Sequence, residues 1–374
     1  MTSKARQLAD LGGDTANLED ISSAYSSGAL SSRNKIINGS MTIDQRNAGA
    51  SVTPTDGEYV IDRWKQYQSV ASKYSVQQNA GGVTPPAGFA NYLGVVSLSS
   101  YTSSSADYFT LEQTIEGYNV ADLGWGTADA ESVTVSFWVR SSLTGTFGGS
   151  IKNKSASADR SYPFSFVISA ANTWERKTIT VIGDTTGTWL NTNGLGITLS
   201  INLGTGTTYS GPAGAWAASN YLSATGATSV VGTSGATFYL TGVQLEVGDT
   251  ATPFEHRSYG AELALCQRYF CKTYNYETPP GTATSVGNLF NSLDATQSYP
   301  YTSVFSYPVT MRATPTITVY NPNTGVAGQI AGDGGTYSAA VNFSGSGRCA
   351  VGVTGTSIGQ STYMRAQATA SAEL

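Results

Sequence analysis

The sequence contains very little histidine and cysteine, which limits the catalytic chemistry that it can support. Among 374 residues there is one histidine, His256, and there are three cysteines, Cys266, Cys271 and Cys349. Any Ser-His-Asp or Cys-His mechanism would have to use His256, which stands where a strand-rich region gives way to a short helix, and a zinc site rich in histidine is excluded. The cysteines are odd in number and form no Cys-x-x-Cys pair, so we expect reduced thiols in a protein made in a cytoplasm.

Charged residues are also scarce, at 12% of the chain against about 25% in ordinary soluble domains. The net charge is -5 and no basic stripe is present, so we expect no nucleic-acid binding. No apolar run approaches the roughly 18 residues of a membrane-spanning helix, and the N-terminus lacks an apolar signal-peptide stretch. We therefore expect neither membrane insertion nor export by an ordinary signal.

Glycine and aromatic residues, by contrast, are plentiful. The chain has 42 glycines, 11% aromatic residues and 40% hydrophobic residues, which favours a mainly β protein with many turns. The segment VTVSFWVR (Val133 to Arg140) alternates apolar and polar residues with the period of a half-buried strand. Further segments alternate similarly at 177–182, 196–203 and 236–245. No long helical pattern interrupts them, so the sequence predicts an antiparallel β-sandwich of the jelly-roll type.

The sequence divides into three parts. In residues 1–32 we expect a short helical segment whose apolar stripe of Leu18, Ile21 and Tyr25 is too short to be stable alone, or alternatively a disordered tail. Residues 33–257 hold the predicted jelly-roll. Residues 258–374 begin with a short helix capped by Ser258 and continue as a smaller β-sandwich knob. Strands of this knob are expected at 301–307, 316–320, 339–343, 350–355 and 363–369.

Several stretches resemble a known family of proteins. NKIINGSMTIDQRNAG (residues 34–49), followed by YVIDRWKQY (59–67), resembles the opening of bacteriophage fibre and other virion-surface proteins. VQLEVGDTATPFEHRSYGAELALCQRYF (243–270) resembles the junction into the C-terminal region of the same family. SKARQLADLGGDTANLEDIS (3–22) resembles N-terminal segments of marine, cyanophage-like fibres. The chain is thus similar to phage tail-fibre or virion-surface fibre proteins at both ends of its central domain.

This resemblance implies a structural virion protein and not an enzyme. The expected protein is a phage tail fibre that is assembled in the host cytoplasm, attaches by residues 1–32 to other virion proteins such as a tail, nozzle or adaptor, and recognises a host surface polysaccharide. Burial of Leu18, Ile21 and Tyr25 among three copies would make it a homotrimer. A head fibre or capsid-decorating protein of the same build is one alternative, and a glycan-hydrolysing tail spike is another.

The middle of the chain resembles a second kind of domain. LEQTIEG (111–117) and VTVSFWVRSS (133–142) look like jelly-roll carbohydrate-binding modules, and this resemblance implies sugar binding and a structural calcium near the ends of the domain. Thr241 and Gly242 stand where such modules commonly have an acidic ligand, and Glu246 with Asp44 would not supply six oxygens. We therefore expect no metal site and no cofactor.

Sugar binding requires aromatic platforms for the apolar faces of pyranose rings, and amide, carboxylate or guanidinium groups for the hydroxyls. Trp138 and Arg140 point away from the apolar face of their strand, so they form the best pair for an exposed sheet surface unless Trp138 packs under a loop. Trp125 lies between two glycines and is expected in a loop, free to bind. The remaining candidates are Trp64 (expected in the core), Trp174, Trp189 and Trp216 (a loop tip or a trimer contact).

A fibre held by its N-terminal end points its C-terminal end outward. The region after Tyr276 is rich in Tyr, Asn, Ser and Gly and has almost no charge, a composition favoured in binding loops. We expect receptor contacts in loops 274–285 and 321–337, with Tyr276, Tyr299, Tyr301, Tyr320 and Tyr337 as stacking residues. Two alternatives stay open: the jelly-roll carries the sugar site, and each tyrosine is ordinary strand packing.

Carboxylates close in sequence raise the question of a glycosidase. Two acids about 5 or 6.5–9.5 Å apart can cleave glycans, and Glu112 with Glu116, or Asp129 with Glu131, are near neighbours. Neighbours in sequence do not thereby face each other across a cleft, and the long β-helical repeats usual in phage depolymerases are absent. The glycine-rich GDGG (Gly332 to Gly335) has neither the lysine nor the helix of a phosphate-binding loop. We therefore expect no catalytic residue.

Overall fold

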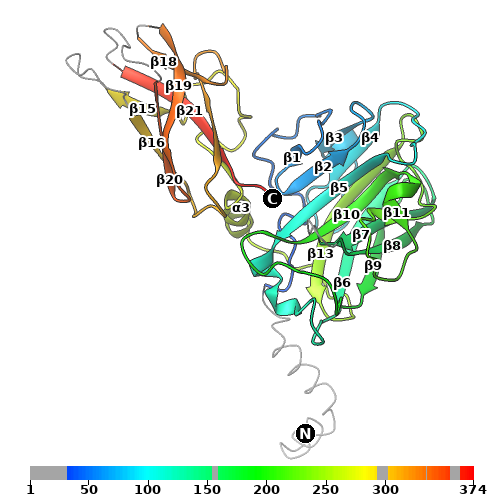
Figure 1. Ribbon diagram of the computed structural model, residues 1–374. Coiled ribbons are helices and arrows are strands. Elements are labelled where there is room, and N and C mark those ends of the chain that lie inside the picture. Colours follow the sequence, from blue (N-terminus) through cyan, green and yellow to red (C-terminus); the bar gives the residue numbers. More distant parts are fainter. Residues whose placement is uncertain (1–31, 154–158, 293–301, 334, 354–362) are drawn as a thin grey trace, which may run out of the picture.

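The computed structural model describes residues 32–153, 159–292, 302–333, 335–353 and 363–374. Apart from its last residue, the expected N-terminal attachment segment, with Leu18, Ile21 and Tyr25, lies outside the described residues, as do Tyr299 and Tyr301. The described residues form two β units, and the helix α3 (Tyr259–Gln267) lies between them (Figure 1).

The first β unit is a sandwich of two antiparallel sheets. Six strands in the order β1-β2-β5-β10-β7-β8 form one sheet, with bounds Tyr59–Ile61, Trp64–Gln68, Tyr108–Glu116, Leu195–Thr205, Gly145–Lys152 and Ser161–Ile168. Five strands in the order β3-β4-β13-β6-β9 form the other, with bounds Tyr74–Gln78, Leu93–Ser97, Thr237–Val247, Val133–Ser141 and Glu175–Val181. The loops hold a short parallel pair and four 3-10 turns: β11 (Ser210–Gly211), β12 (Ser223–Ala224), η1 (Ala80–Gly82), η2 (Gly117–Asn119), η3 (Ala121–Leu123) and η4 (Thr207–Tyr209).

The core of the sandwich lies between the two sheets, where alternate residues of each strand meet. On β6 the inward residues Val133, Val135, Phe137 and Val139 are completely buried, and they belong to one cluster with inward residues of β10. This alternation, predicted for Val133 to Arg140, is confirmed. The other three predicted strands correspond to β9, β10 and β13. The predicted mainly β, antiparallel sandwich is therefore what the chain adopts.

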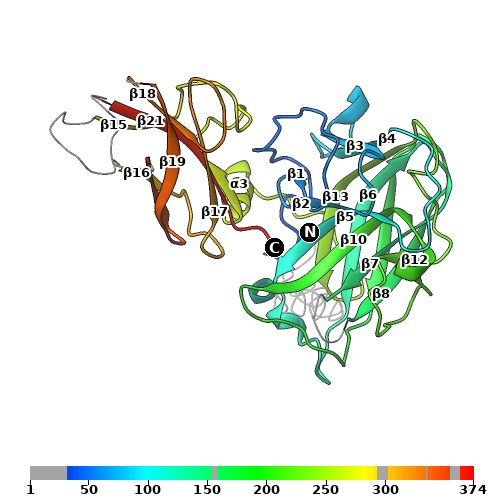
Figure 2. The same cartoon turned by 45° about the horizontal axis from the view of Figure 1, so that its top comes forward.

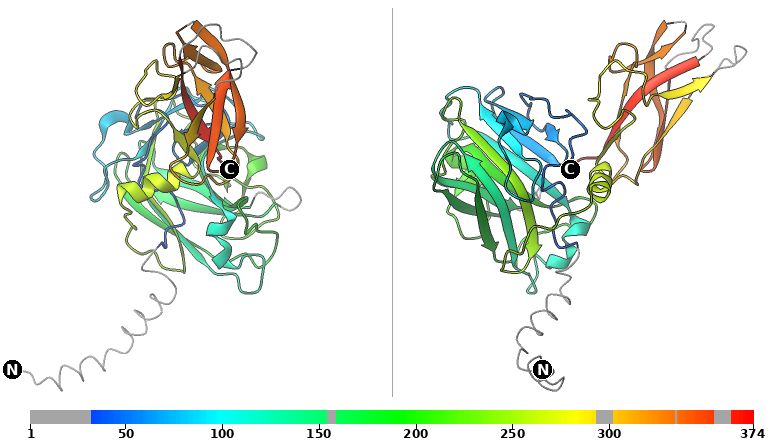
Figure 3. Two further views of the ribbon diagram at one scale, coloured as in Figure 1. Left: turned by 90° about the vertical axis from the view of Figure 1, so that its left-hand side faces the viewer. Right: turned by 180° about the vertical axis from the view of Figure 1, so that it is seen from behind.

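The second β unit contains eight strands in one hydrogen-bonded network. Its main path runs β14-β21-β18-β19-β20-β16, while β15 and β17 also pair with β21, all antiparallel. The strands β14 to β21 are Phe270–Lys272, Leu289–Ser292, Thr302–Ser306, Thr316–Tyr320, Gln329–Gly332, Gly335–Ser344, Arg348–Val353 and Tyr363–Ser371. Small inward residues of β21 (Ala366, Ala368 and Ala370) are buried in a core that is separate from that of the sandwich. Figure 3 shows this unit projecting from one side of the sandwich.

The helix α3 begins where the sequence predicted. The Ser258 hydroxyl accepts a hydrogen bond from the Ala261 backbone N–H (3.4 Å), as expected of an N-cap. Cys266 on α3 is buried, and like Cys271 and Cys349 it is a free thiol, which agrees with the predicted reduced state. Within the described ranges no helix has the length and apolar character needed to cross a membrane.

Candidate functional site

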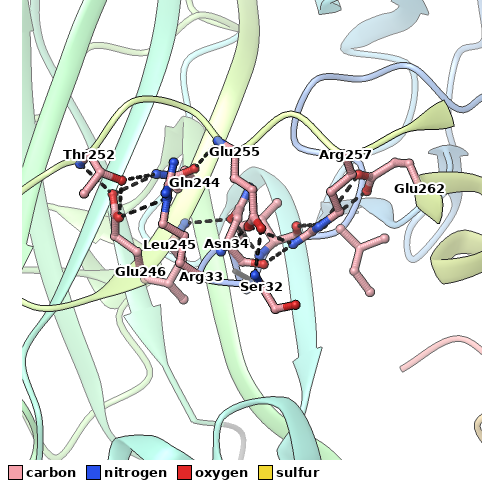
Figure 4. A network of polar contacts seen from close by, with 12 residues as sticks. Ser32, Arg33, Asn34, Gln244, Leu245, Glu246, Thr252, Glu255, Arg257 and Glu262 are labelled. Atoms are coloured by element: carbon pink, nitrogen blue, oxygen red, sulfur yellow. Dashed lines mark hydrogen bonds and ion pairs between the residues drawn. The ribbon is translucent and has the colours of Figure 1, made fainter. Parts of the chain in front are cut away.

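The stretches that resemble phage fibre proteins fold against one another (Figure 4). The Asn34 side chain donates to the Val243 carbonyl (3.2 Å) and accepts from the Leu245 N–H (3.1 Å). Glu255 accepts a hydrogen bond from the Asn34 N–H (2.7 Å), and Arg257 donates to the Asn34 carbonyl. These contacts connect the segment that enters the sandwich, at Asn34, with the segment that leaves it, at Glu255 and Arg257. Their polar side chains bond mainly to one another, although Asn34, Glu255 and Arg257 also border two open hollows of about 560 and 660 Å³.

Two arginines and one carboxylate connect the two β units, at a contact that we call the joint. Arg63, which is 1% exposed, pairs with Glu373, and Arg46 pairs with the same carboxylate at 2.7 Å. The guanidinium of Arg63 lies 3.5 Å from the ring centre of Tyr269, and that of Arg46 lies 3.8 Å from the ring centre of Phe270. Ion pairing and stacking thus occur together, in the geometry that makes cation–π contacts strongest when water is excluded.

A second ion pair closes the other side of this joint. Arg268 contacts both carboxylate oxygens of Glu116 (2.9 and 2.6 Å), and the Tyr269 hydroxyl donates to the same group (2.9 Å). The chain also ends in the joint, since the Tyr59 hydroxyl donates to the Leu374 carbonyl (2.7 Å). Figures 1 and 2 show the C-terminus between the two units. A bidentate pair of this kind adds geometric specificity to the contact between the two units.

Asp62 makes the joint sensitive to pH. It is 1% exposed and accepts two hydrogen bonds from Gln45, each at 2.7 Å, and burial raises the pKa of its carboxyl to about 6. A raised pKa means that the folded protein binds the proton more tightly than the unfolded chain does. The stabilisation that protonated Asp62 contributes is therefore complete below pH 3.8 and is lost as the pH rises through about 6.

Asp62→Asn removes this titration. We expect the free energy of unfolding of the wild type, relative to that of the variant, to fall by up to about 3 kcal/mol between pH 4 and pH 7. Urea denaturation of both proteins across this range measures the difference. A difference that stays constant with pH would contradict the burial of a titrating carboxyl at this position.

Tyr276, predicted as a receptor-stacking residue, lies in the joint and packs against the sandwich, which is the alternative interpretation for this tyrosine. Its hydroxyl accepts from the Asp44 N–H (2.7 Å) and donates to the Thr42 carbonyl (3.3 Å). Lys272 holds the turn in place by donating to three carbonyls, including that of Gln45 (2.6 Å). The chain therefore turns back onto the sandwich after α3, which the composition of this loop did not reveal.

The other two described tyrosines of the predicted receptor surface are partly packed. Tyr320 on β17 is half-buried, with its ring edge-on to Tyr274 at 6.0 Å. Tyr337 on β19 is half-buried and packs against the second core. The alternative interpretation, strand packing, describes both of them. Tyr301 lies outside the described residues.

Trp138 and Arg140 lie on the outer face of the five-stranded sheet, as the alternation of β6 predicted. Trp138 is half-buried beside Gly242, where a Cβ atom would come within 3.1 Å of the indole and 2.6 Å of the Phe89 ring. Arg140 donates to the Asn172 carbonyl (3.0 Å) and lies 5.4 Å from the ring centre of Tyr239. This pair is thus flanked by protein and offers only part of its surface to a ligand.

Three tryptophans that come from different loops meet at one end of the sandwich. The ring centres of Trp125 and Trp189 are 4.7 Å apart. The ring centre of Trp216 lies 5.2 Å from that of Trp125 and 5.4 Å from that of Trp189, and the planes of each pair of rings are near perpendicular. Each indole N–H donates to a loop carbonyl, at 2.7 to 3.1 Å. Trp125 lies in a loop, as expected, but it is only 7% exposed and is therefore not a free platform. Trp64, expected in the core, is completely buried there.

Two of these tryptophans line a small pocket, which we call the tryptophan pocket. Its volume is about 180 Å³. Trp125 and Trp189 form walls, Ile197 of β10 forms part of the base, and Thr127 and Asn191 supply polar side chains. The remaining lining residues are Val120, Ala121, Leu123, Gly124 and Leu190. The sequence showed each tryptophan as a candidate but gave no sign that they converge.

An ion pair beneath the cluster holds the loops of the pocket together. Arg160 contacts both oxygens of Asp184, each at 2.7 Å, and its guanidinium lies 5.9 Å from the ring centre of Trp216. The Asp184 carbonyl also accepts from the Gly126 N–H (2.7 Å). Burial would raise the pKa of Asp184, but the hydrogen bonds from Arg160 and Thr186 hold it below its usual value. This network therefore ties together the loops that carry the three tryptophans.

The carboxylates considered for glycan cleavage are engaged elsewhere. Glu112 pairs with Lys152 (3.2 Å) and accepts from the Ser200 hydroxyl (2.7 Å), whereas Glu116 belongs to the joint. Asp129 and Glu131 are exposed. At these four positions the structure forms no pair of acids that faces across the tryptophan pocket, since none of them lines it.

The residues considered for metal binding also have other partners. Asp44 accepts from the N–H groups of Asn47 and Gly49 (2.9 and 2.7 Å), and Glu246 accepts from Thr252. In the part of the chain that is described, no three His, Cys, Asp or Glu side chains gather as a metal site would need. His256 is exposed and packs edge-on to Phe254 at 4.9 Å, as expected of a junction residue.

No protein-family model and no curated protein matches the sequence. Solved structures that match part of it include the enzymatically active domain of tailspike protein 4 of bacteriophage CBA120, which is 12% identical with a TM-score of 0.32 over 57% of this chain and 21% of that chain. A CBM22-2 xylan-binding domain from Paenibacillus barcinonensis is 15% identical, with a TM-score of 0.30 over 53% of this chain and 99% of that chain. A family 11 carbohydrate-binding module from Clostridium thermocellum, in complex with a mixed-linked tetrasaccharide, is 15% identical, with a TM-score of 0.27 over 55% of this chain and 98% of that chain. Similarities at this level assign no family to the chain.

Proposed function

We propose that this chain is a bacteriophage fibre that attaches to the virion by residues 1–32, assembles as a homotrimer and binds a host surface glycan. The virion role rests on the sequence resemblance at 34–49 and 243–270. The rigid joint built from these stretches suits a fibre, because it holds the two β units in one orientation while the virion meets the cell.

The tryptophan pocket is the observation that carries the glycan-binding role. Indole rings are large and apolar but have a polar edge, and they stack against the C–H face of pyranose rings. Trp189 is half-buried, and it packs against Trp125 and Trp216, so the exposed part of its ring is what a ligand can meet. A concave site with apolar walls and a few polar groups is the usual form of a small-ligand site.

Trp189→Ala tests this role in the full chain. We expect the variant to bind panels of bacterial surface polysaccharides at least about tenfold more weakly than the wild type, because buried aromatic anchors dominate binding energy. Trp174→Ala is the matched control: this tryptophan is also half-buried and also donates to a loop carbonyl, that of Thr84 (2.9 Å), but it lies on the outer face of the five-stranded sheet.

The proposed glycan binding would be contradicted if the wild type bound no polysaccharide of the panel. If Trp174→Ala abolished binding and Trp189→Ala did not, the glycan-binding site would lie on the outer face of the five-stranded sheet and not at the tryptophan pocket. Thermal melts of both variants establish that each remains folded.

A further inference from the structure

We infer that the tryptophan pocket receives a single, uncharged sugar ring at the end of a glycan, and not an internal stretch of a polysaccharide chain. This inference rests on the proposed glycan-binding function and defines its ligand. The volume of the pocket, the angle between its tryptophans, the charge of its lining and its one free polar side chain each support it.

The volume limits the ligand to one ring. Pockets for drug-sized ligands occupy roughly 300–1,000 Å³, whereas this pocket has about 180 Å³. A second ring would lie outside it. The position of the pocket among loop residues at the end of the sandwich gives it an opening to solvent through which the rest of the glycan leaves.

The angle between the two tryptophans favours end-on binding. A binding groove for a straight chain needs aromatic rings in line, so that successive sugars stack on them. Trp125 and Trp189 meet at 79°, so the two rings cannot stack on neighbouring sugars of a straight chain. One indole can instead face the flat side of a sugar while the other closes the pocket behind it.

The lining carries no charge. Its ten residues include no Lys, Arg, Asp or Glu. Of the charged residues near it, Arg160 pairs with Asp184, and Asp122 pairs with Lys35 at 2.6 Å. The other two, Asp129 and Glu131, are exposed acids whose backbones contact Thr127 and Trp125, and they offer no cation to an anionic sugar. A uronic or sialic acid would lose hydration of its carboxylate without gaining a cation, which is costly. A neutral hexose or N-acetylhexosamine meets no such penalty.

One polar side chain of the lining remains free to select the sugar. Thr127 is committed, since its hydroxyl donates to the Gly124 carbonyl (2.6 Å) and accepts from the Asp129 N–H (3.2 Å). Asn191 is exposed, and the described residues give its amide no hydrogen bond. A carboxamide both donates and accepts, which matches a pair of neighbouring hydroxyls on a sugar ring.

Methyl glycosides test the inference with the full chain. Tryptophan fluorescence and saturation-transfer NMR are recorded with the methyl glycosides of glucose, galactose, mannose and N-acetylglucosamine, and with methyl glucuronide. We expect at least one neutral glycoside to bind and to displace the polysaccharide that the wild type binds, with the glucuronide at least about tenfold weaker.

Variants locate the binding. Asn191→Ala is expected to weaken the binding of the neutral glycoside about three- to tenfold. Trp189→Ala is expected to abolish the fluorescence change that the glycoside causes. Asn342→Ala, an exposed asparagine on β19, is the matched control and is expected to bind normally. Polysaccharide binding that no monosaccharide displaces, equal binding of the glucuronide, or unchanged binding by Asn191→Ala would overturn the inference while leaving glycan binding itself intact. Absence of all glycan binding would instead overturn the proposed function.

Discussion

Replacing Arg63 with methionine is expected to lower the free energy of unfolding by about 3–5 kcal/mol and to separate the unfolding of the two β units. Methionine fills similar space but leaves Glu373 with one cation instead of two, and leaves the Thr114 carbonyl without its donor. It also removes the guanidinium that stacks on Tyr269. Because these partners belong to both units, the loss falls on the joint.

Urea denaturation and differential scanning calorimetry measure the two effects. The wild type is expected to unfold in one transition and Arg63→Met in two, since the units have separate cores and depend on the joint for their coupling. Lys177→Met is the control, because its pair with Glu175 (2.5 Å) lies within the edge strand β9 with both side chains partly exposed, joins no second unit, and is worth about 1 kcal/mol or less. Equal losses in the two variants would show that the joint is not a stabilising network.

The strands were predictable from the sequence because the residues that face the core are apolar and those on the other face are mostly polar, even where both faces are covered. On β6 the alternation of Val133 to Val139 with polar residues reports this directly. The start of α3 was predictable from Ser258 for a similarly local reason, an N-cap hydroxyl before a short apolar stripe. The order of the strands was not, because β10 pairs with β5 and β7 over long separations that no periodicity encodes.

The joint and the tryptophan pocket depend on this long-range order, which is why the sequence showed neither. Arg63 and Asn34 look like surface residues in the sequence. The free energy that their burial costs is compensated only by hydrogen bonds and ion pairs with partners on distant segments. One signal was present: charged residues are rare in this chain, yet they gather in the stretches at 34–49, 59–67 and 243–270. A concentration of charge in a chain of low charge indicates a buried network when its members come from separated segments.

The second large effect is expected from the buried pair of Glu112 and Lys152. It lies on the outer face of the six-stranded sheet, where β5 and β7 flank β10, and the two side chains are only 7% and 5% exposed. Burial would raise the pKa of Glu112, but Lys152 and the Ser200 hydroxyl, with a smaller contribution from Lys65, hold it below its usual value. The carboxylate therefore stays charged and contributes stability above its ordinary pKa.

Lys152→Met leaves that carboxylate buried without its main cation, so we expect the free energy of unfolding at pH 7 to fall by about 3–5 kcal/mol. The loss should shrink as the pH falls from 7, because without Lys152 burial raises the pKa of Glu112 above its ordinary value of 4.5, and protonation of the folded variant then removes the unpaired charge. Removing both charges in Glu112→Leu/Lys152→Met should recover most of the stability, since two apolar side chains of similar size replace a pair whose desolvation is costly. Urea denaturation of the two single variants and the double variant completes a thermodynamic cycle. If the double variant is less stable than either single variant, the ion pair itself stabilises the sheet. The losses in the single variants would then come from losing the pair, and not from leaving one buried charge unpaired.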